Sequence, residues 1–143
     1  VQITVSGSAR RATYRLEADG LGGIDLEASN LVIGPGTYGP GDEVRFGFDM
    51  SNLRSDDATT PSYTVWLGDS QAHDPQADTQ LGAFTLSGDL TGNSSVSLAD
   101  RVDLPGTLTG GTGYIHVTVE PTNQTDPVPN NNVATTSISL SSN

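Results

Sequence analysis

The densest group of side chains that could do chemistry is the acidic stretch 69–78. Asp69, Asp74 and Asp78 supply carboxylates there. Ca²⁺ prefers hard oxygen ligands, about six to eight of them, and acidic loops often supply these. The three carboxylates would converge if the stretch folded back on itself, so the sequence predicts a candidate Ca²⁺ site at these residues. The stretch has neither the central Gly nor the closing Glu of an EF-hand loop, and a solvated turn capped by its own Asp side chains is the alternative interpretation.

A second group of oxygen donors precedes the last apolar segment of the chain. Ligand binding and ordinary turn formation both account for such a group, because Asn and Asp side chains commonly bond the backbone next to a strand. Its members are Glu120, Asn123, Asp126 and Asn130 to Asn132.

Catalytic side chains do not form a recognisable constellation. His73 and His116 are the two histidines, and His116 falls on the polar side of an alternating segment. A catalytic histidine needs a nucleophile and an orienting acid beside it, and no nucleophile elbow, phosphate loop or zinc motif occurs in the sequence. The chain also has no cysteine, which excludes disulfides and thiol chemistry. We therefore expect a protein that is not an enzyme.

The net negative charge of the chain restricts the kinds of molecule that it can bind. The formal net charge is −11, and all six basic residues are arginine. Binding to nucleic acid or to an anionic membrane requires clustered positive charge, so we expect neither partner. An acidic surface instead favours solubility and divalent cations.

Period-two alternation of apolar and polar residues indicates that strands position these side chains. The clearest example is Glu43–Met50, in which Val44, Phe46, Phe48 and Met50 face one way. We expect an irregularity at Ala28–Asn30 and a bulge or a strand end near Ala99–Asp100. The seven predicted strands are 24–33, 43–50, 62–68, 81–87, 95–104, 113–120 and 133–140.

Seven short strands separated by turn residues are typical of an all-β, immunoglobulin-like Greek-key β-sandwich. Uneven loop lengths favour this fold over an up-and-down barrel. The one tryptophan, Trp66, lies on the third predicted strand, where we expect it to fill the space between the sheets. The predicted core comprises Phe46, Phe48, Trp66, Val117 and Ile138.

The first 23 residues are predicted to form an addition to this domain. Segments 2–6 and 12–17 alternate like a hairpin, and the Gly-rich run 19–23 separates them from the rest. The predicted organisation is therefore an N-terminal hairpin at 1–23 and a sandwich at 24–143. Residues 2–6 could also pair with a neighbouring chain by strand addition.

Residues 24–141 resemble the CARDB domain, a cell-adhesion-related domain found in bacteria. The resemblance rests on the order of several short motifs, of which each alone is weak. These are Ile24-Asp25-Leu26, Gly39 to Val44, Met50-Ser51-Asn52, Val65 to Asp69, Asp78 to Gly82, Leu104-Pro105, Gly113-Tyr114, Val119-Glu120-Pro121 and Asn130 to Val133. Gly68 stands where the family has a serine.

The resemblance implies a non-catalytic structural or adhesion module of a secreted or cell-surface protein. Its expected partners are neighbouring domains of the parent chain, other surface proteins or polysaccharide. The alternative is a calcium-dependent accessory carbohydrate-binding module attached to a secreted hydrolase. That alternative would need two or three exposed aromatic rings on one face, and the candidate rings are Tyr38, Tyr63, Trp66 and Tyr114.

Overall fold

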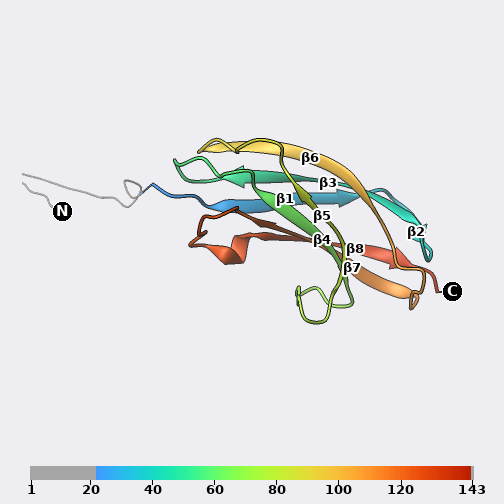
Figure 1. Ribbon diagram of the computed structural model, residues 1–143. Coiled ribbons are helices and arrows are strands. Elements are labelled where there is room, and N and C mark those ends of the chain that lie inside the picture. Colours follow the sequence, from blue (N-terminus) through green and yellow to red (C-terminus); the bar gives the residue numbers. More distant parts are fainter. Residues whose placement is uncertain (1–21, 143) are drawn as a thin grey trace, which may run out of the picture.

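The computed structural model describes residues 22–142, which form a sandwich of two β-sheets (Figure 1). This confirms the predicted all-β, immunoglobulin-like fold. The strands in these residues are β1 (Leu26–Ile33), β2 (Thr37–Tyr38), β3 (Glu43–Asn52), β4 (Ser62–Gly68), β5 (Thr79–Thr85), β6 (Ser94–Asp103), β7 (Gly111–Glu120) and β8 (Val133–Leu140), and a single 3-10 turn spans Pro129–Asn131. The N-terminal hairpin predicted at 1–23 lies almost wholly outside the described residues and stays a prediction.

The chain passes from one sheet to the other between its first two strands, β1 and β2. β1 belongs to the three-stranded sheet β1-β3-β6, whereas β2 joins the five-stranded sheet β2-β8-β7-β4-β5. The switch occurs at Gly34-Pro35-Gly36, where Gly36 adopts a left-handed φ of 121° that a side chain would strain. As a result, β2 pairs in parallel with the last strand, through Thr37 opposite Ser139 and Tyr38 opposite Leu140.

The core lies between the sheets and is centred on aromatic rings. The apolar row of β3 that includes Phe46 and Phe48 is buried, as its alternation predicts. Tyr63 of β4 packs edge-on against Phe48, with ring centroids 5.0 Å apart, and is stacked at 4.9 Å with Phe84 of β5. Such pairs contribute beyond the area that they bury, so this cluster ties the two sheets together.

The prediction that Trp66 belongs to this core is wrong. Tyr63 and Val65 occupy the inward positions of β4, so the alternation of the strand places Trp66 on the opposite face. Its indole Nε1 donates a hydrogen bond to Thr118 Oγ1 at 3.0 Å, and its ring packs against His73. Trp66 therefore belongs to the outer face of the five-stranded sheet, where the site described below lies.

Of the two predicted strand irregularities, the first is confirmed. The β1–β3 register shifts between Ser29 and Val32, and Asn30 has a φ of 55°. The bulge or strand end predicted near Ala99–Asp100 is wrong, because β6 continues to Asp103 and pairs with β3 without a shift through both residues. β6 lies at the edge of its sheet, and Asp100 is exposed there. This polar side chain therefore interrupts the apolar row of β6 while the backbone pairing with β3 continues.

Tyr63 makes the stability of the fold depend on pH in the alkaline range. Burial, and then the nearby Asp100 carboxylate, raise the pKa of its phenol to about 12. In the unfolded chain the pKa of a tyrosine is about 10. At a pH between about 10 and about 12, the unfolded chain therefore releases the Tyr63 proton whereas the folded chain retains it. The free energy of unfolding should therefore fall as pH rises above about 10.

The matched variant for this prediction is Tyr63→Phe, which keeps the ring and removes the titrating group. Urea unfolding at pH 9 and pH 11 should show a smaller loss of stability in the variant than in the native chain. Equal losses in the two proteins would contradict the assignment to Tyr63.

Candidate metal centre

One row of side chains crosses the outer face of the five-stranded sheet. Trp66 on β4 lies opposite His116 on β7, which in turn lies opposite Thr135 on β8. The neighbouring residues Val65, Val117 and Ala134 point into the core, so strand alternation directs the row away from it. The interpretation of His116 as a residue on the polar side of its strand is therefore right, yet its side chain is 0% exposed.

The β4–β5 loop, residues 69–78, buries His116 by folding back over this row. In Figure 1 the loop projects from the body of the sandwich below β4 and β5. A turn at its end is closed by hydrogen bonds from the Ala77 and Asp78 N–H groups to the Asp74 carbonyl. The Asp74 carboxylate caps the Gln76 N–H at 2.9 Å, an Asx turn of the kind that Asp favours.

Gly68, at the end of β4, makes room for the loop. A β-carbon at this position would lie 2.5 Å from Asp78 Oδ1, closer than such contacts occur. The Asp78 carboxylate therefore lies directly against the backbone of β4. This accounts for the glycine at position 68, where the resembled family has a serine.

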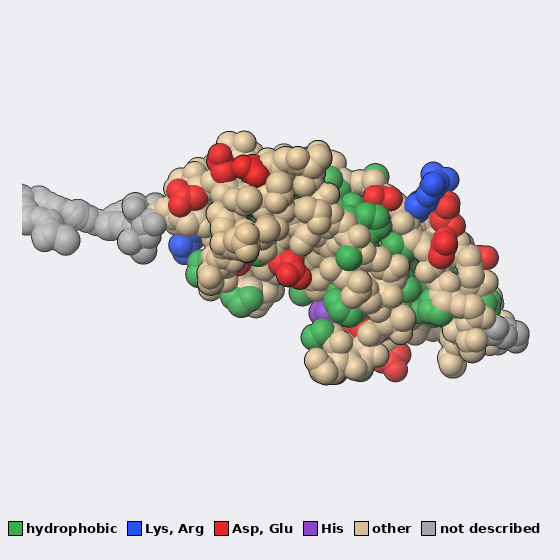
Figure 2. All heavy atoms as spheres, in the orientation of Figure 1, with side chains coloured by type: hydrophobic (Ala, Val, Ile, Leu, Met, Phe, Trp, Pro, Cys, Tyr) green, Lys and Arg blue, Asp and Glu red, His purple; other side chains and the backbone are tan. Residues whose placement is uncertain are grey.

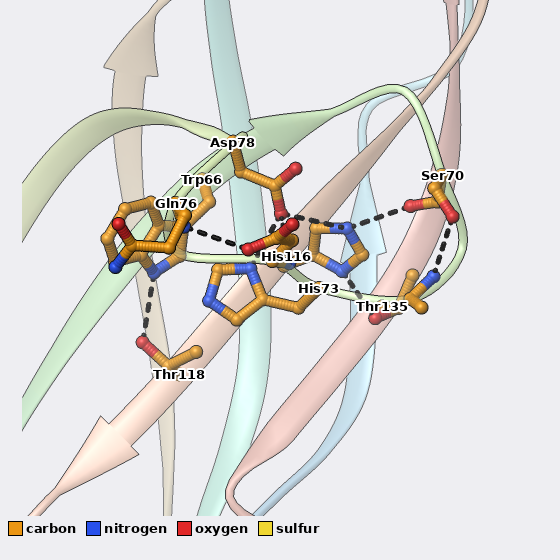
Figure 3. A network of polar contacts seen from close by, with 10 residues as sticks. Trp66, Ser70, His73, Gln76, Asp78, His116, Thr118 and Thr135 are labelled. Carbon is orange, nitrogen blue, oxygen red and sulfur yellow. Dashed lines mark hydrogen bonds and ion pairs between the residues drawn. The ribbon is translucent and has the colours of Figure 1, made fainter.

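Asp78 is the centre of a compact polar cluster (Figure 3). Its Oδ2 lies 2.7 Å from His73 Nδ1 and 3.7 Å from His116 Nε2, and it accepts the Asp74 N–H at 2.9 Å. The Asp78 side chain is 3% exposed and that of His73 is 11% exposed. Figure 2 shows a small patch of histidine surface at the base of the projecting loop.

The bonds of His116 define its protonation. Its Nε2 lies 3.1 Å from the Ser70 carbonyl oxygen, and its Nδ1 lies 2.7 Å from Thr135 Oγ1. A carbonyl only accepts, so Nε2 carries the proton and Nδ1 accepts from the Thr135 hydroxyl. Burial lowers the pKa of His116 below its ordinary value, although the Asp78 carboxylate opposes this shift. The ring is therefore neutral at neutral pH.

Asp78 itself is ionised at that pH. Burial alone would raise its pKa, but the Asp74 N–H, the hydrogen bond from His73 and the nearby imidazoles together hold the pKa below its ordinary value. The cluster thus offers one carboxylate and two imidazoles, and its three ligand atoms all lie within 4.8 Å of one another. Such a group can hold a metal ion.

The structure brings together only some of the predicted Ca²⁺ site. Asp78 lies in the cluster, whereas the side chains of Asp69 and Asp74 are exposed and lie outside it. Among residues 22–142, the group of His73, Asp78 and His116 is the one that meets the geometric requirement for a metal. Binding of Ca²⁺ by Asp69, Asp74 and Asp78 stays a prediction.

Three members of the second predicted group have structural partners, whereas Asn131 Oδ1 and Asn132 Oδ1 are buried without a hydrogen-bond partner. Asp126 accepts the Leu26 N–H at 2.9 Å and the Val128 N–H at 2.9 Å. Asn131 donates to Asp25 Oδ1, and Asn132 donates to the Val119 carbonyl. The bond to Val128 is the local contact of the turn interpretation, and the other bonds join the turn before β8 to the start of β1 and the end of β7.

The pairing of the two histidines was not predicted from the sequence. His73 and His116 are 43 positions apart in the sequence (116 − 73), yet their ring centroids lie 5.2 Å apart. A usable signal was present in the strands, because Trp66 and His116 both occupy positions that point away from the core. A loop with a histidine after β4 is well placed to cover them.

The fold is similar to that of solved CARDB domains. The CARDB domain of a Pyrococcus furiosus protein, crystallised in complex with di-metal ions, superposes with a TM-score of 0.59 at 20% identity, covering 83% of this chain and 90% of that one. The fold is that of a CARDB domain. This confirms the fold that the motifs suggested. No protein-family model and no curated protein matches the sequence.

The CARDB-like sandwich also resembles segments of longer proteins. A sporulation control protein from Bacillus subtilis matches with a TM-score of 0.54 at 11% identity, over 85% of this chain and 51% of that one. A β-glucosidase from Thermotoga neapolitana matches with a TM-score of 0.51 at 13% identity, over 81% of this chain and 16% of that one. Within residues 22–142, no helix is long and apolar enough to span a membrane.

Proposed function

We propose that this CARDB-like domain is a non-catalytic, force-resisting spacer and adhesion module of a larger extracellular or cell-surface protein. The observation that carries the proposal is the path of the chain through the sandwich. Figure 1 shows the chain entering at one end and leaving at the opposite end.

Specific contacts fix those two ends. At the entry, the Gly23 N–H bonds Asp56, and Asp25 bonds Asn131 just before β8 begins. At the exit, the Ser141 N–H bonds the Tyr38 carbonyl after β8 ends. β8 alone, with eight residues, spans roughly 26 Å at about 3.3 Å per residue, so each domain advances the parent chain by at least that distance.

The parallel pairing of β2 with β8 suits a chain under tension. A pull on the two ends draws β2 toward the N-terminal end and β8 toward the opposite end, so the bonds between Thr37–Tyr38 and Ser139–Leu140 are loaded in shear. Bonds loaded in shear must break together, whereas bonds at one end of a ladder open one at a time. The acidic surface and the likeness to CARDB domains support the extracellular setting.

The carbohydrate-binding alternative lacks a specific observation in its favour. Tyr63 is buried in the core, and Trp66 is packed against His73 beneath the loop. Tyr63 is therefore not available as a stacking platform, and Trp66 is half-buried.

Single-molecule force spectroscopy on tandem copies of the chain tests the mechanical role. Each copy should unfold in one step, releasing about 120 residues at roughly 3.4 Å each, or roughly 400 Å less the folded length. The chain has no cysteine, so cysteines introduced at Pro40 and after Asn143 can serve as attachment points for a second pulling direction. A pull on these two points separates β2 from β8 from one end, and the bonds between the two strands then break one after another. Unfolding forces that are no higher in the end-to-end pull than in the peeling pull would overturn the proposal.

A further inference from the structure

The donor atoms of the cluster identify the class of metal that it would take. We propose that His73, Asp78 and His116 form a binding site for a late first-row divalent transition metal, with Zn²⁺ as the representative, and that this metal fastens the β4–β5 loop to the sheet. This site is independent of the mechanical role, because it lies on the outer face and involves neither β1 nor β2.

The chemistry of the ligands excludes calcium from this cluster. Ca²⁺ takes oxygen ligands, about six to eight of them, whereas His73 Nδ1 and His116 Nε2 provide two of the three donor atoms here. Neutral imidazole and carboxylate together suit zinc and its neighbours. To bind a metal through Nε2, His116 would move its proton from Nε2 to Nδ1, where Thr135 Oγ1 lies 2.7 Å away.

The spacing of the donors is close to that of a bound ion. Donors of a tetrahedral zinc lie roughly 3.4 Å apart, given bonds of about 2.0–2.2 Å. The Asp78 Oδ2 atom lies 2.7 Å from His73 Nδ1 and 3.7 Å from His116 Nε2, values on either side of that spacing. A metal ion would replace the His73–Asp78 hydrogen bond and the bond of His116 Nε2 to the Ser70 carbonyl.

The surroundings supply the support that metal ligands need. Thr135 Oγ1 lies 2.7 Å from His116 Nδ1, so it can accept a hydrogen bond from an Nδ1–H group once Nε2 faces a metal. Gly68 allows Asp78 to approach the backbone, and Trp66 packs on His73 with ring centroids 4.9 Å apart. The Ser70 carbonyl, 3.1 Å from His116 Nε2, is a further oxygen donor beside the site.

The test uses the full chain without a histidine tag, stripped of metal by a chelator and then desalted. Calorimetric titration with zinc chloride should give one site per chain. At a hundredfold excess over Kd, zinc should raise the melting temperature by about 5–10 °C, and calcium chloride should not reproduce this shift.

Two variants assign the site. His73→Asn keeps a donor near the position of Nδ1, and so keeps the bond to Asp78, but it should weaken zinc binding by more than about a hundredfold, because even the loss of a supporting partner costs about 10–100-fold. The matched control, Asp69→Asn with Asp74→Asn, removes the two exposed carboxylates of the same loop and should bind zinc as the native chain does.

Three results would overturn the proposal: no zinc binding by the native chain, zinc binding that survives His73→Asn unchanged, or a calcium shift that equals the zinc shift and disappears in the double Asn control. Should His73→Asn fail to fold, cobalt(II) titration of the native chain decides the matter. Strong visible absorption of a four-coordinate site supports the proposal, and the weak absorption of hydrated cobalt contradicts it.

Discussion

Replacing Asp78 by alanine should destabilise the metal-free domain by about 3 kcal/mol. The carboxylate is 3% exposed and accepts bonds from His73 and from the Asp74 N–H. A buried donor left without a partner costs about 1–3 kcal/mol, and this applies to the part-buried His73 Nδ1, whereas the exposed Asp74 N–H can bond water instead. For a domain of this size the loss corresponds to a fall in melting temperature of roughly 10 °C, which differential scanning calorimetry measures.

Asp74→Ala is the control for that variant. Its exposed carboxylate caps only the Gln76 N–H, so the change should cost no more than about 1 kcal/mol. Similar losses for the two variants would show that Asp78 is merely another residue of a solvated loop. That outcome would contradict the role of Asp78 as the centre of a buried cluster.

Phe48→Ala should have the largest effect on the sandwich, a loss of about 4 kcal/mol, because truncating a buried Phe removes transfer free energy and leaves a cavity. Phe48 is 2% exposed and contacts Tyr63 edge-on across the two sheets. Urea denaturation should show a lower midpoint with an unchanged slope.

Val32→Ala is the matched change on the surface. Val32 lies on β1 and is 62% exposed, so its truncation should cost less than about 1 kcal/mol. A loss for Phe48→Ala as small as that for Val32→Ala would mean that the aromatic cluster does not join the sheets.

The strands could be predicted because their alternation reports burial directly. Glu43–Asn52 carries four apolar residues in one parity, and the structure buries all four. Val133–Leu140 and Ser62–Gly68 occur within the predicted bounds. β2 escaped prediction, since two residues that pair with a distant strand leave no periodic pattern.

Trp66 shows where reasoning from side-chain type fails. Its size and hydrophobicity favoured the core, but the parity of β4 assigns the inward positions to Tyr63 and Val65. The outer face of a sheet is ordinarily solvated, and here the loop of residues 69–78 covers it. Loop placement depends on contacts such as Asp78 against Gly68, which no local pattern reveals.

The acidic stretch contributes Asp78 and His73 to the cluster, but the three predicted Asp residues do not come together in it. Three Asp residues suggested oxygen chemistry, whereas the structure gathers Asp78 with His73 and with His116 from β7. The second histidine enters through strand pairing of β4 with β7, which places it opposite Trp66. Sequence proximity therefore identified the loop, and tertiary structure completed the ligand set.

The most direct test of the metal centre is a crystal structure of the tag-free chain grown with zinc, with diffraction data recorded on both sides of the zinc absorption edge. An anomalous peak within about 2.0–2.2 Å of His73 Nδ1, Asp78 Oδ2 and His116 Nε2 is the predicted result. A peak at the exposed carboxylates of Asp69 or Asp74, with the His73–Asp78 hydrogen bond intact, would contradict it.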